Sequence, residues 1–233
     1  MEMMSACSRS LRAMGRGTAS MEEAAELMVR HLYEGLRMGK NGPPAAALVR
    51  FFKTHAYGAL TPELREFADG LSGGSSMDPE TKCLTLLASA GEEPAWNSRH
   101  QSGGHRAIPL LSEEAVLRAP MIARLIQTLG LPVSEVLNPE PSLMRERAGQ
   151  SFNVFFVRNA HGSPFIPAQE GFVIPFGIKS VIGLGGLLPS GSLFAMILFL
   201  RLELSEETAD LFKPLPLSMK LGVLEHDAGA PFA

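Results

Sequence analysis

The feature that most constrains the fold is an apolar run from Val181 to Leu200, which has the length and hydropathy of a membrane-spanning helix. The triplet Pro189-Ser-Gly191 divides this run, and it favours a turn because proline presets φ and glycine accepts a positive φ. Each flank has about the length of a strand, and the segment 201–204 continues with the alternating pattern of a strand. We therefore predict two buried strands joined by a tight turn, with no membrane insertion, followed by a helix that begins at Ser205.

The composition is typical of a folded, intracellular domain. Apolar residues make up 45% of the 233 residues, which is enough to form a substantial core. The formal net charge of -3 excludes the basic footprint of a nucleic-acid-binding protein. The two cysteines, Cys7 and Cys83, are far apart and imply no disulfide framework, so we expect a reducing, cytoplasmic location.

The chain is predicted to contain one domain with a short tail at each end. Residues 1–19 lack an apolar run of signal-peptide length and are expected to form a disordered tail. Residues 20–226 form the predicted domain, and residues 227–233 form a second tail. The domain begins with the capping box Ser20-Met-Glu-Glu23, which opens an amphipathic helix that extends to Leu36.

Periodicity and turn residues place the remaining elements. Strands are expected at 45–54, 82–89 and 152–157, and helices at 61–71 and 112–129, with a short helix after Pro141. Two long connections, 91–108 and 161–175, are polar or rich in proline. This order predicts an α/β (α+β) fold with a mostly antiparallel central sheet and helices packed on one face.

Eight sequence motifs together resemble one family of sensory domains. They are Lys82-Cys-Leu-Thr-Leu-Leu-Ala, Pro94-Ala-Trp-Asn97, Ser102-Gly-Gly-His105, Ala107-Ile-Pro-Leu110, Gly162-Ser-Pro-Phe-Ile-Pro-Ala-Gln169, Pro175-Phe-Gly-Ile-Lys-Ser-Val181, Leu188-Pro-Ser-Gly-Ser-Leu-Phe-Ala195 and Glu207-Thr-Ala-Asp-Leu-Phe212. The segment 20–224 resembles a GAF-like sensory input domain of the kind found ahead of bacterial two-component histidine kinases. The resemblance implies a sheet of about five to six strands, with N- and C-terminal helices on one face and a helical and loop insert on the other.

The same resemblance implies a regulatory module and no catalytic residues. Its expected partners are an unknown small molecule, a histidine kinase or response regulator, and a second copy of the chain. The helix at 20–36 and the last helix are the expected dimer surface. Pro214 and Pro216 depart from the pattern, because a proline inside a helix costs about 3 kcal/mol and would interrupt signal transmission through the last helix.

In such a fold the ligand would lie between the sheet and two covering segments, 92–110 and 161–176. These segments and the adjacent strand supply the candidate ligand-binding residues: apolar Trp96, Phe165, Phe172 and Phe176, and polar Asn97, His105, Arg106, Asn153 and Gln169. This mixture suits a small, partly apolar ligand whose identity the sequence leaves open. Alternatively, the aromatic residues are ordinary core and the polar residues brace the loops.

Two other kinds of site have weaker support. The run Gly183-Leu-Gly-Gly186 lacks the third glycine of a dinucleotide-binding loop, so its glycines are assigned to close packing within the sheet. The spacing of His100, His105 and Cys83 matches no structural zinc pattern, and no metal site is predicted. The alternative functions are a metal-assisted enzyme that uses the His100/His105 loop, and a degenerate GAF-like module that binds only protein.

Overall fold

The computed structural model describes residues 2–39, 41–140, 147, 149, 152–227, 229 and 232. Its centre is a six-stranded antiparallel sheet with the strand order β3-β2-β1-β6-β5-β4. The strands are β1 (Ala46–Ala56), β2 (Lys82–Gly91), β3 (Ala107–Pro109), β4 (Phe152–Val157), β5 (Ser180–Leu187) and β6 (Leu193–Leu200). The predicted α+β fold class with an antiparallel sheet is confirmed.

The apolar run that suggested a membrane span forms the β5–β6 hairpin. The two strands pair from Ser180↔Leu200 to Leu187↔Leu193, and every residue of both strands is buried. Gly191 has a φ of 84°, and its N–H donates to the Leu188 carbonyl oxygen at 2.9 Å, which closes the predicted turn. Burial of each large aliphatic or aromatic side chain stabilises the fold by about 1.5–3 kcal/mol, so this hairpin is a principal source of stability. Among the described residues, no helix is long and apolar enough to cross a membrane.

The hairpin ends earlier than its alternating pattern suggests. Strand β6 ends at Leu200, and the segment 201–204 does not continue it. The Arg201 guanidinium instead donates to the carbonyl oxygens of Phe176 and Ala46, at 3.1 and 3.2 Å. The Arg201 N–H also donates to the Ala45 carbonyl oxygen at 2.8 Å, so this residue is fixed at the end of the strand by both its backbone and its side chain.

Glycines in β5 allow close approach within and above the sheet. A Cβ atom at Gly185 would lie 2.8 Å from the Phe194 carbonyl oxygen, and one at Gly183 would lie 3.0 Å from Phe155 Cδ1. Both distances are shorter than ordinary van der Waals contacts. The packing interpretation of these glycines is thus confirmed.

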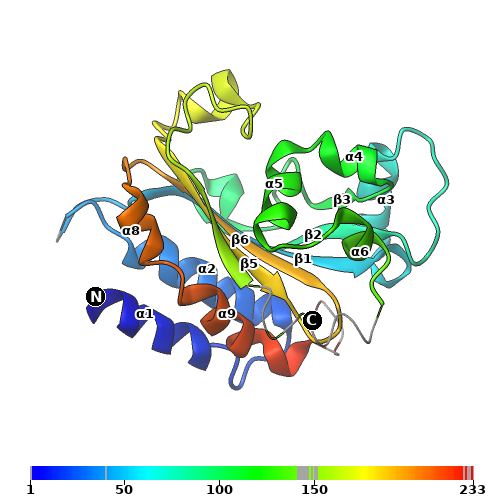
Figure 1. The fold of residues 1–233 in the computed structure, drawn as a ribbon, viewed down its shortest axis with the longest axis horizontal. Coiled ribbons are helices and arrows are strands. Elements are labelled where there is room, and N and C mark those ends of the chain that lie inside the picture. The colour runs from blue at the N-terminus through cyan, green and yellow to red at the C-terminus, as the bar shows by residue number, and fades with distance from the viewer. Residues whose placement is uncertain are drawn as a thin grey trace.

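Terminal helices cover one face of the sheet (Figure 1): α1 (Glu2–Ala13), α2 (Met21–Gly35) and α9 (Leu215–Val223). The predicted N-cap is present, because Ser20 Oγ accepts from the Glu23 N–H at 3.1 Å. Glu23 also reaches back, but its Oε2 accepts from the N–H of Ala19, one residue before the N-cap, at 2.7 Å. The predicted stripe of α2, including Met28 and Leu32, is buried against the sheet.

The predicted disordered tail at 1–19 is wrong for its main part, because Glu2–Ala13 form α1. An apolar stripe with helical spacing runs along this segment: Met4, Cys7, Leu11 and Met14. It packs against the core between the sheet and the terminal helices, and Leu11 is completely buried. The stripe is short, and its partner surface is α9, about 200 residues away in sequence. The local sequence pattern alone therefore did not indicate that α1 is an ordered helix.

The last helix is also organised differently from the prediction. The segment 205–223 forms two short helices, α8 (Glu206–Asp210) and α9, in place of one helix interrupted by proline. Pro214 is the N-cap residue of α9, and Pro216 lies in its first turn. Neither proline breaks an internal helical hydrogen bond, because first-turn N–H groups have no helical acceptor.

The other face of the sheet is covered by short helices and loops (Figure 1). These elements are η1 (Tyr57–Ala59), α3 (Pro62–Leu71), η2 (Pro94–Asn97), α4 (Glu113–Leu117), α5 (Pro120–Thr128), α6 (Val133–Leu137) and the π-helical turn η3 (Gln169–Val173). Strand β3 and helix α6 were not predicted, and the helix expected after Pro141 lies outside the described residues. The division into one domain and two tails otherwise stays a prediction.

Candidate functional site

A cavity of about 870 Å³ lies between the sheet and the cover formed by α3, α5, η2, η3 and their connecting loops. Its floor consists of alternate residues of two adjacent central strands: Leu48, Arg50 and Phe52 of β1, and Ala195, Ile197 and Phe199 of β6. Intervening residues such as Phe51 and Phe194 belong to the helical face, where their rings stack 6.2 Å apart. The strand period therefore divides an almost wholly apolar sequence between two layers.

Aromatic side chains form one wall of the cavity. The ring of Trp96 lies 5.5 Å from that of Phe172 and 4.5 Å from that of Phe176, measured between centroids. Phe172 also contacts Phe199 on the floor, at 4.9 Å, and Phe165 lines the cavity farther along the same connection. Edge-on and tilted ring pairs of this kind are favourable, so the wall is a defined apolar surface.

The polar groups of the cavity are concentrated at Arg50 and the loop that carries His105. Arg50 Nη2 donates to Ser102 Oγ at 3.2 Å, and this hydroxyl donates to the Gly104 carbonyl oxygen at 2.7 Å. Arg50 Nε is buried and has no hydrogen-bond partner in the described part of the chain. The cavity thus contains a cation with unused hydrogen-bonding capacity.

Burial affects the ionisation of both basic groups. Desolvation lowers the pKa of Arg50 to about 10, so that the guanidinium remains protonated at neutral pH. Burial, and then the nearby charge of Arg50, lower the pKa of His105. His105 lines the cavity and keeps an exposed surface, and its φ of 64° is unusual for a residue other than glycine. The neutral imidazole is therefore the favoured form beside Arg50.

Four of the nine predicted site residues line the cavity: Trp96, His105, Phe165 and Phe172. Phe176 does not line the cavity, but it contacts Trp96 and belongs to the same aromatic cluster. Their role in ligand binding stays a prediction, but the structure brings these side chains together.

Two further predicted residues brace the covering loops. Asn97 Nδ2 donates to the Gly91 and Glu93 carbonyl oxygens at 2.9 and 3.0 Å. Gln169 Nε2 donates to the Ala160 and Ile166 carbonyl oxygens at 3.1 and 2.6 Å. These contacts hold the two connections in place beside the cavity.

The remaining two predicted residues also have partners elsewhere. Arg106 forms an ion pair with Glu63, and its guanidinium lies over the ring of Phe67, which itself lines the cavity. Asn153 Nδ2 donates to the Thr128 carbonyl oxygen at 3.0 Å, which ties β4 to the end of α5. Both residues support the walls rather than lining them.

Arg50 and the floor residues of β6 were not among the predicted site residues. A signal for Arg50 was present, because it is the first charged residue in the apolar run that begins at Ala45. A charged side chain inside a central strand requires a partner or a functional role. The residues of β6 carry no such signal, since both faces of that strand are apolar.

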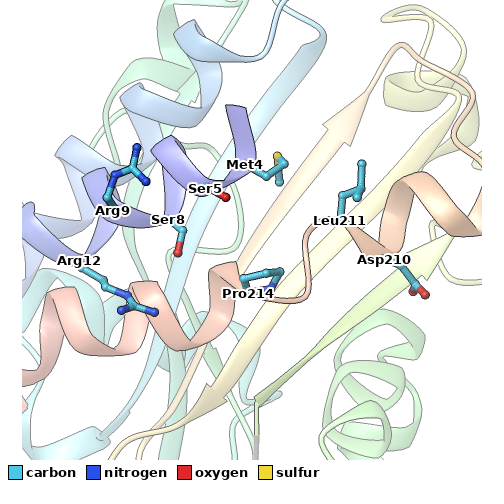
Figure 2. Close-up of a pocket in the computed structure, with 8 residues that line it drawn as sticks. All are labelled: Met4, Ser5, Ser8, Arg9, Arg12, Asp210, Leu211 and Pro214. Atoms are coloured by element: carbon cyan, nitrogen blue, oxygen red, sulfur yellow. The ribbon is translucent and has the colours of Figure 1, made fainter. Parts of the chain in front are cut away.

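A smaller pocket of about 360 Å³ lies between α1 and the α8–α9 corner (Figure 2). Ser8 and Arg12 approach α9, where Ser8 Oγ lies 2.6 Å from Ser218 Oγ and Arg12 Nε donates to the same hydroxyl at 3.3 Å. On its other side, Asp210 forms an ion pair with Lys213 at 2.8 Å. Ser8, Arg12 and Asp210 therefore have partners within the protein, and the pocket has less than half the volume of the larger cavity, which is the stronger candidate site.

Metal and thiol chemistry receive no support from the described residues. No three His, Cys, Asp or Glu side chains in the described ranges are arranged to hold a metal ion. His100 is exposed and lies 3.8 Å from Glu63, and it does not line the cavity. Burial raises the pKa values of Cys7 and Cys83 to about 11, so both thiols are protonated and weakly nucleophilic at neutral pH.

The chain has structural neighbours of low sequence identity among known proteins. Neither a protein-family model nor a curated protein matches the chain. Among solved structures, the chain is similar to the GAF domain of a phosphoenolpyruvate-protein phosphotransferase from Coxiella burnetii. The identity is 14% and the TM-score is 0.43, over 97% of this chain and 94% of that chain.

Two other neighbours are GAF domains, each from a cyanobacterial phytochrome. One is bound to phycocyanobilin, with 9% identity and a TM-score of 0.45 over 96% of this chain and 94% of that chain. The other is bound to phycoerythrobilin, with 11% identity and a TM-score of 0.43 over 96% of this chain and 97% of that chain. The fold described above rests on the strand order and layers of this chain itself.

Proposed function

We propose that this chain is a non-catalytic sensory domain that binds a small molecule in the 870 Å³ cavity. The cavity is the observation that carries the proposal. It is mainly apolar, it has a few polar groups at one end, and its volume is in the range of pockets that enclose small ligands.

The sheet provides a physical link between the cavity and the terminal helices. Strands β1 and β6 supply the cavity floor on one face and pack against the helical layer on the other. A ligand that displaces Phe52 or Ala195 therefore acts on strands that also position Phe51 and Phe194. The proposed output is a change in the helical layer that a cytoplasmic histidine kinase or response regulator detects.

We propose that a second copy of the chain binds the outer side of this helical layer. The inner stripe of α2 is used in the core, so the dimer contact would involve exposed apolar residues such as Leu27, Leu221 and Leu224, which are 44%, 44% and 39% exposed.

We expect Leu221→Glu to weaken self-association at least about tenfold, because it places a charge in an apolar contact. Sedimentation velocity over a concentration series measures this. Leu117→Glu, on α4 and 54% exposed, is the matched control on the other face. A strictly monomeric wild-type protein would contradict the dimer.

Native mass spectrometry of the purified protein tests the proposed function directly, because it detects a co-purifying small molecule. A fluorescence titration provides a second test. Trp96 is the single tryptophan of the chain and lines the cavity, so its emission should change when a neutral aromatic probe such as 2-methylnaphthalene enters.

Filling the floor of the cavity should prevent probe binding. Ala195 is buried under the cavity, and Ala195→Phe would place a ring in that space. We expect its affinity for 2-methylnaphthalene to fall at least about tenfold, or 1.4 kcal/mol, without unfolding of the protein. The matched control is Ala59→Phe at an exposed site in η1, which should bind like the wild type. Equal affinities of the wild type and Ala195→Phe would show that the probe does not enter the cavity.

The alternative functions make different predictions for the same purified protein. A metal-assisted enzyme that uses His100 and His105 requires stoichiometric zinc or iron, which elemental analysis would detect. A degenerate module that binds only protein requires that neither a co-purifying ligand nor an effect of the probe on Trp96 is found.

A further inference from the structure

We propose that the ligand is an organic monoanion, with a carboxylate bound by Arg50 and an apolar, ring-containing body enclosed by the aromatic wall. This inference rests on the proposed function, because it specifies what the same cavity binds.

The first observation is that Arg50 is unlike the other well-packed arginines around the site. Arg106 is paired with Glu63, Arg201 with Glu92 and Arg99 with Glu22. Arg50 forms no ion pair within the described ranges, and its one hydrogen bond is to the neutral hydroxyl of Ser102. Among the residues that the structure describes, no aspartate or glutamate lines the cavity either. Within this part of the chain, the cation therefore has no acidic partner.

The second observation is the position of this cation. Arg50 lies between Leu48 and Phe52 on the cavity face of β1, and all three line the cavity. Its Nε is buried and has no hydrogen-bond partner among the described residues, although the residue as a whole is only half-buried. Desolvation lowers the pKa of Arg50, which means that its surroundings disfavour the charged form relative to water. A bound anion would offset part of this desolvation.

The third observation is that the loop hydrogen-bonded to Arg50 through Ser102 leaves space for a polar group. Gly103 and Gly104 line the cavity, and a Cβ atom at either position would meet nothing within 4 Å. Ser102 accepts a hydrogen bond from Arg50 Nη2 and donates one to the Gly104 carbonyl oxygen, so it ties the guanidinium to this loop. A carboxylate could thus approach the planar donor group of Arg50, a pairing that arginine forms with good geometry.

The distribution of charge favours a monoanion over a phosphate. The other arginine that lines the cavity, Arg118, is 75% exposed and forms an ion pair with Glu114. His105 is held in its neutral form beside Arg50 and can contribute a hydrogen bond but little charge. One uncompensated guanidinium matches one carboxylate, whereas a dianionic phosphate would remain half-neutralised in a mainly apolar cavity.

The test compares two probes of nearly the same shape, one anionic and one neutral: naphthalene-2-acetate and its amide, titrated at pH 7.5 against Trp96 fluorescence. We expect the wild type to bind the carboxylate at least about tenfold more tightly than the amide, the range for a hydrogen bond to a charged group. Arg50→Met should abolish this preference while retaining affinity for 2-methylnaphthalene. Arg50→Lys, which keeps the charge but loses the planar donor pair, should show an intermediate preference.

The outcomes separate this inference from the proposed function. Equal wild-type affinity for the acid and the amide, or tighter binding of the amide, would overturn the inference and leave the cavity as a binding site for neutral ligands. Failure of the acid, the amide and 2-methylnaphthalene to bind would overturn the proposed function itself. If Arg50→Met does not fold, the wild-type ratio together with Arg50→Lys still decides the result.

Discussion

Gly222→Ala is expected to destabilise the protein by about 2–3 kcal/mol and to release α1 from α9. The alanine Cβ would lie 2.2 Å from the Leu11 carbonyl oxygen and 2.4 Å from Met28 Cε. Met28 can adjust its side chain, but the Leu11 carbonyl belongs to the backbone of α1 and can move only with the helix. Gly15, in the turn after α1, packs against the backbone of Gly222 itself, and a Cβ at Gly15 would be 1.6 Å from the Gly222 carbonyl oxygen. Helix α1 and the turn that follows it can pack against α9 because both positions lack a side chain.

Denaturant-induced unfolding measures this effect, and limited proteolysis after Arg9 and Arg12 reports whether α1 is released. The control is Gly70→Ala in α3, where a Cβ would meet nothing within 4 Å. There, alanine should stabilise the protein by up to about 1 kcal/mol, because glycine is a poor helix former. A loss of stability at Gly70 as large as that at Gly222 would contradict the steric explanation.

Acidification between pH 6.5 and pH 3 is expected to destabilise the protein through His55. This residue is 7% exposed, both of its ring nitrogens lack hydrogen-bond partners in the described structure, and its ring centroid lies 5.7 Å from that of Phe232. Burial, followed by the charges of Lys53 and Lys82, lowers its pKa to about 3. The unfolded chain therefore binds a proton below pH 6.5 that the folded protein does not accept until about pH 3.

The sign and size of the effect follow from this difference. Because the unfolded state binds more protons in this window, the free energy of unfolding falls as the pH falls. The contribution of His55 is on the order of 2 kcal/mol at pH 5 and 4 kcal/mol at pH 3. The lowered pKa of His105 acts in the same direction.

His55→Phe should flatten the dependence of stability on pH and raise the stability near pH 5, since it removes a titrating group and two unsatisfied polar atoms. The free energy of unfolding at pH 7.5, 6, 5 and 4 measures this. His161→Leu, at an exposed position in the 161–175 connection, is the control for loss of an imidazole. A wild-type curve with the same slope as that of His55→Phe would contradict the assignment.

Much of the fold was determined by patterns that act over a few residues. The β5–β6 hairpin followed from two strand-length apolar runs and the Pro189-Ser-Gly191 turn, and the start of α2 followed from the Ser20 capping box. Turn chemistry, capping and periodicity depend on near neighbours, so they can be inferred without knowing the rest of the molecule. The resemblance to GAF-like domains supplied the two-layer arrangement around the sheet.

The candidate site was only partly predictable for the same reason. The two covering connections were identified because they are long, aromatic and polar, and the structure places Trp96, His105, Phe165 and Phe172 around one cavity. Asn97 and Gln169 have the same chemical types as ligand-binding residues, but their amides are bonded to nearby backbone. Residue type alone does not distinguish these two uses of a polar side chain.

The sequence by itself therefore determined where the central strands and their turn lie, which helix starts with a capping box, and that the chain has enough apolar residues for a core. Only the tertiary structure decided that α1 is ordered, that Pro214 and Pro216 start a helix, and that Arg50 faces a cavity in which the described residues offer it no carboxylate. The physical reason is the range of the interactions. Hydrophobic burial against α9, the approach of Gly15 and Gly222, and the desolvation of Arg50 all depend on segments that meet only when the sheet has assembled.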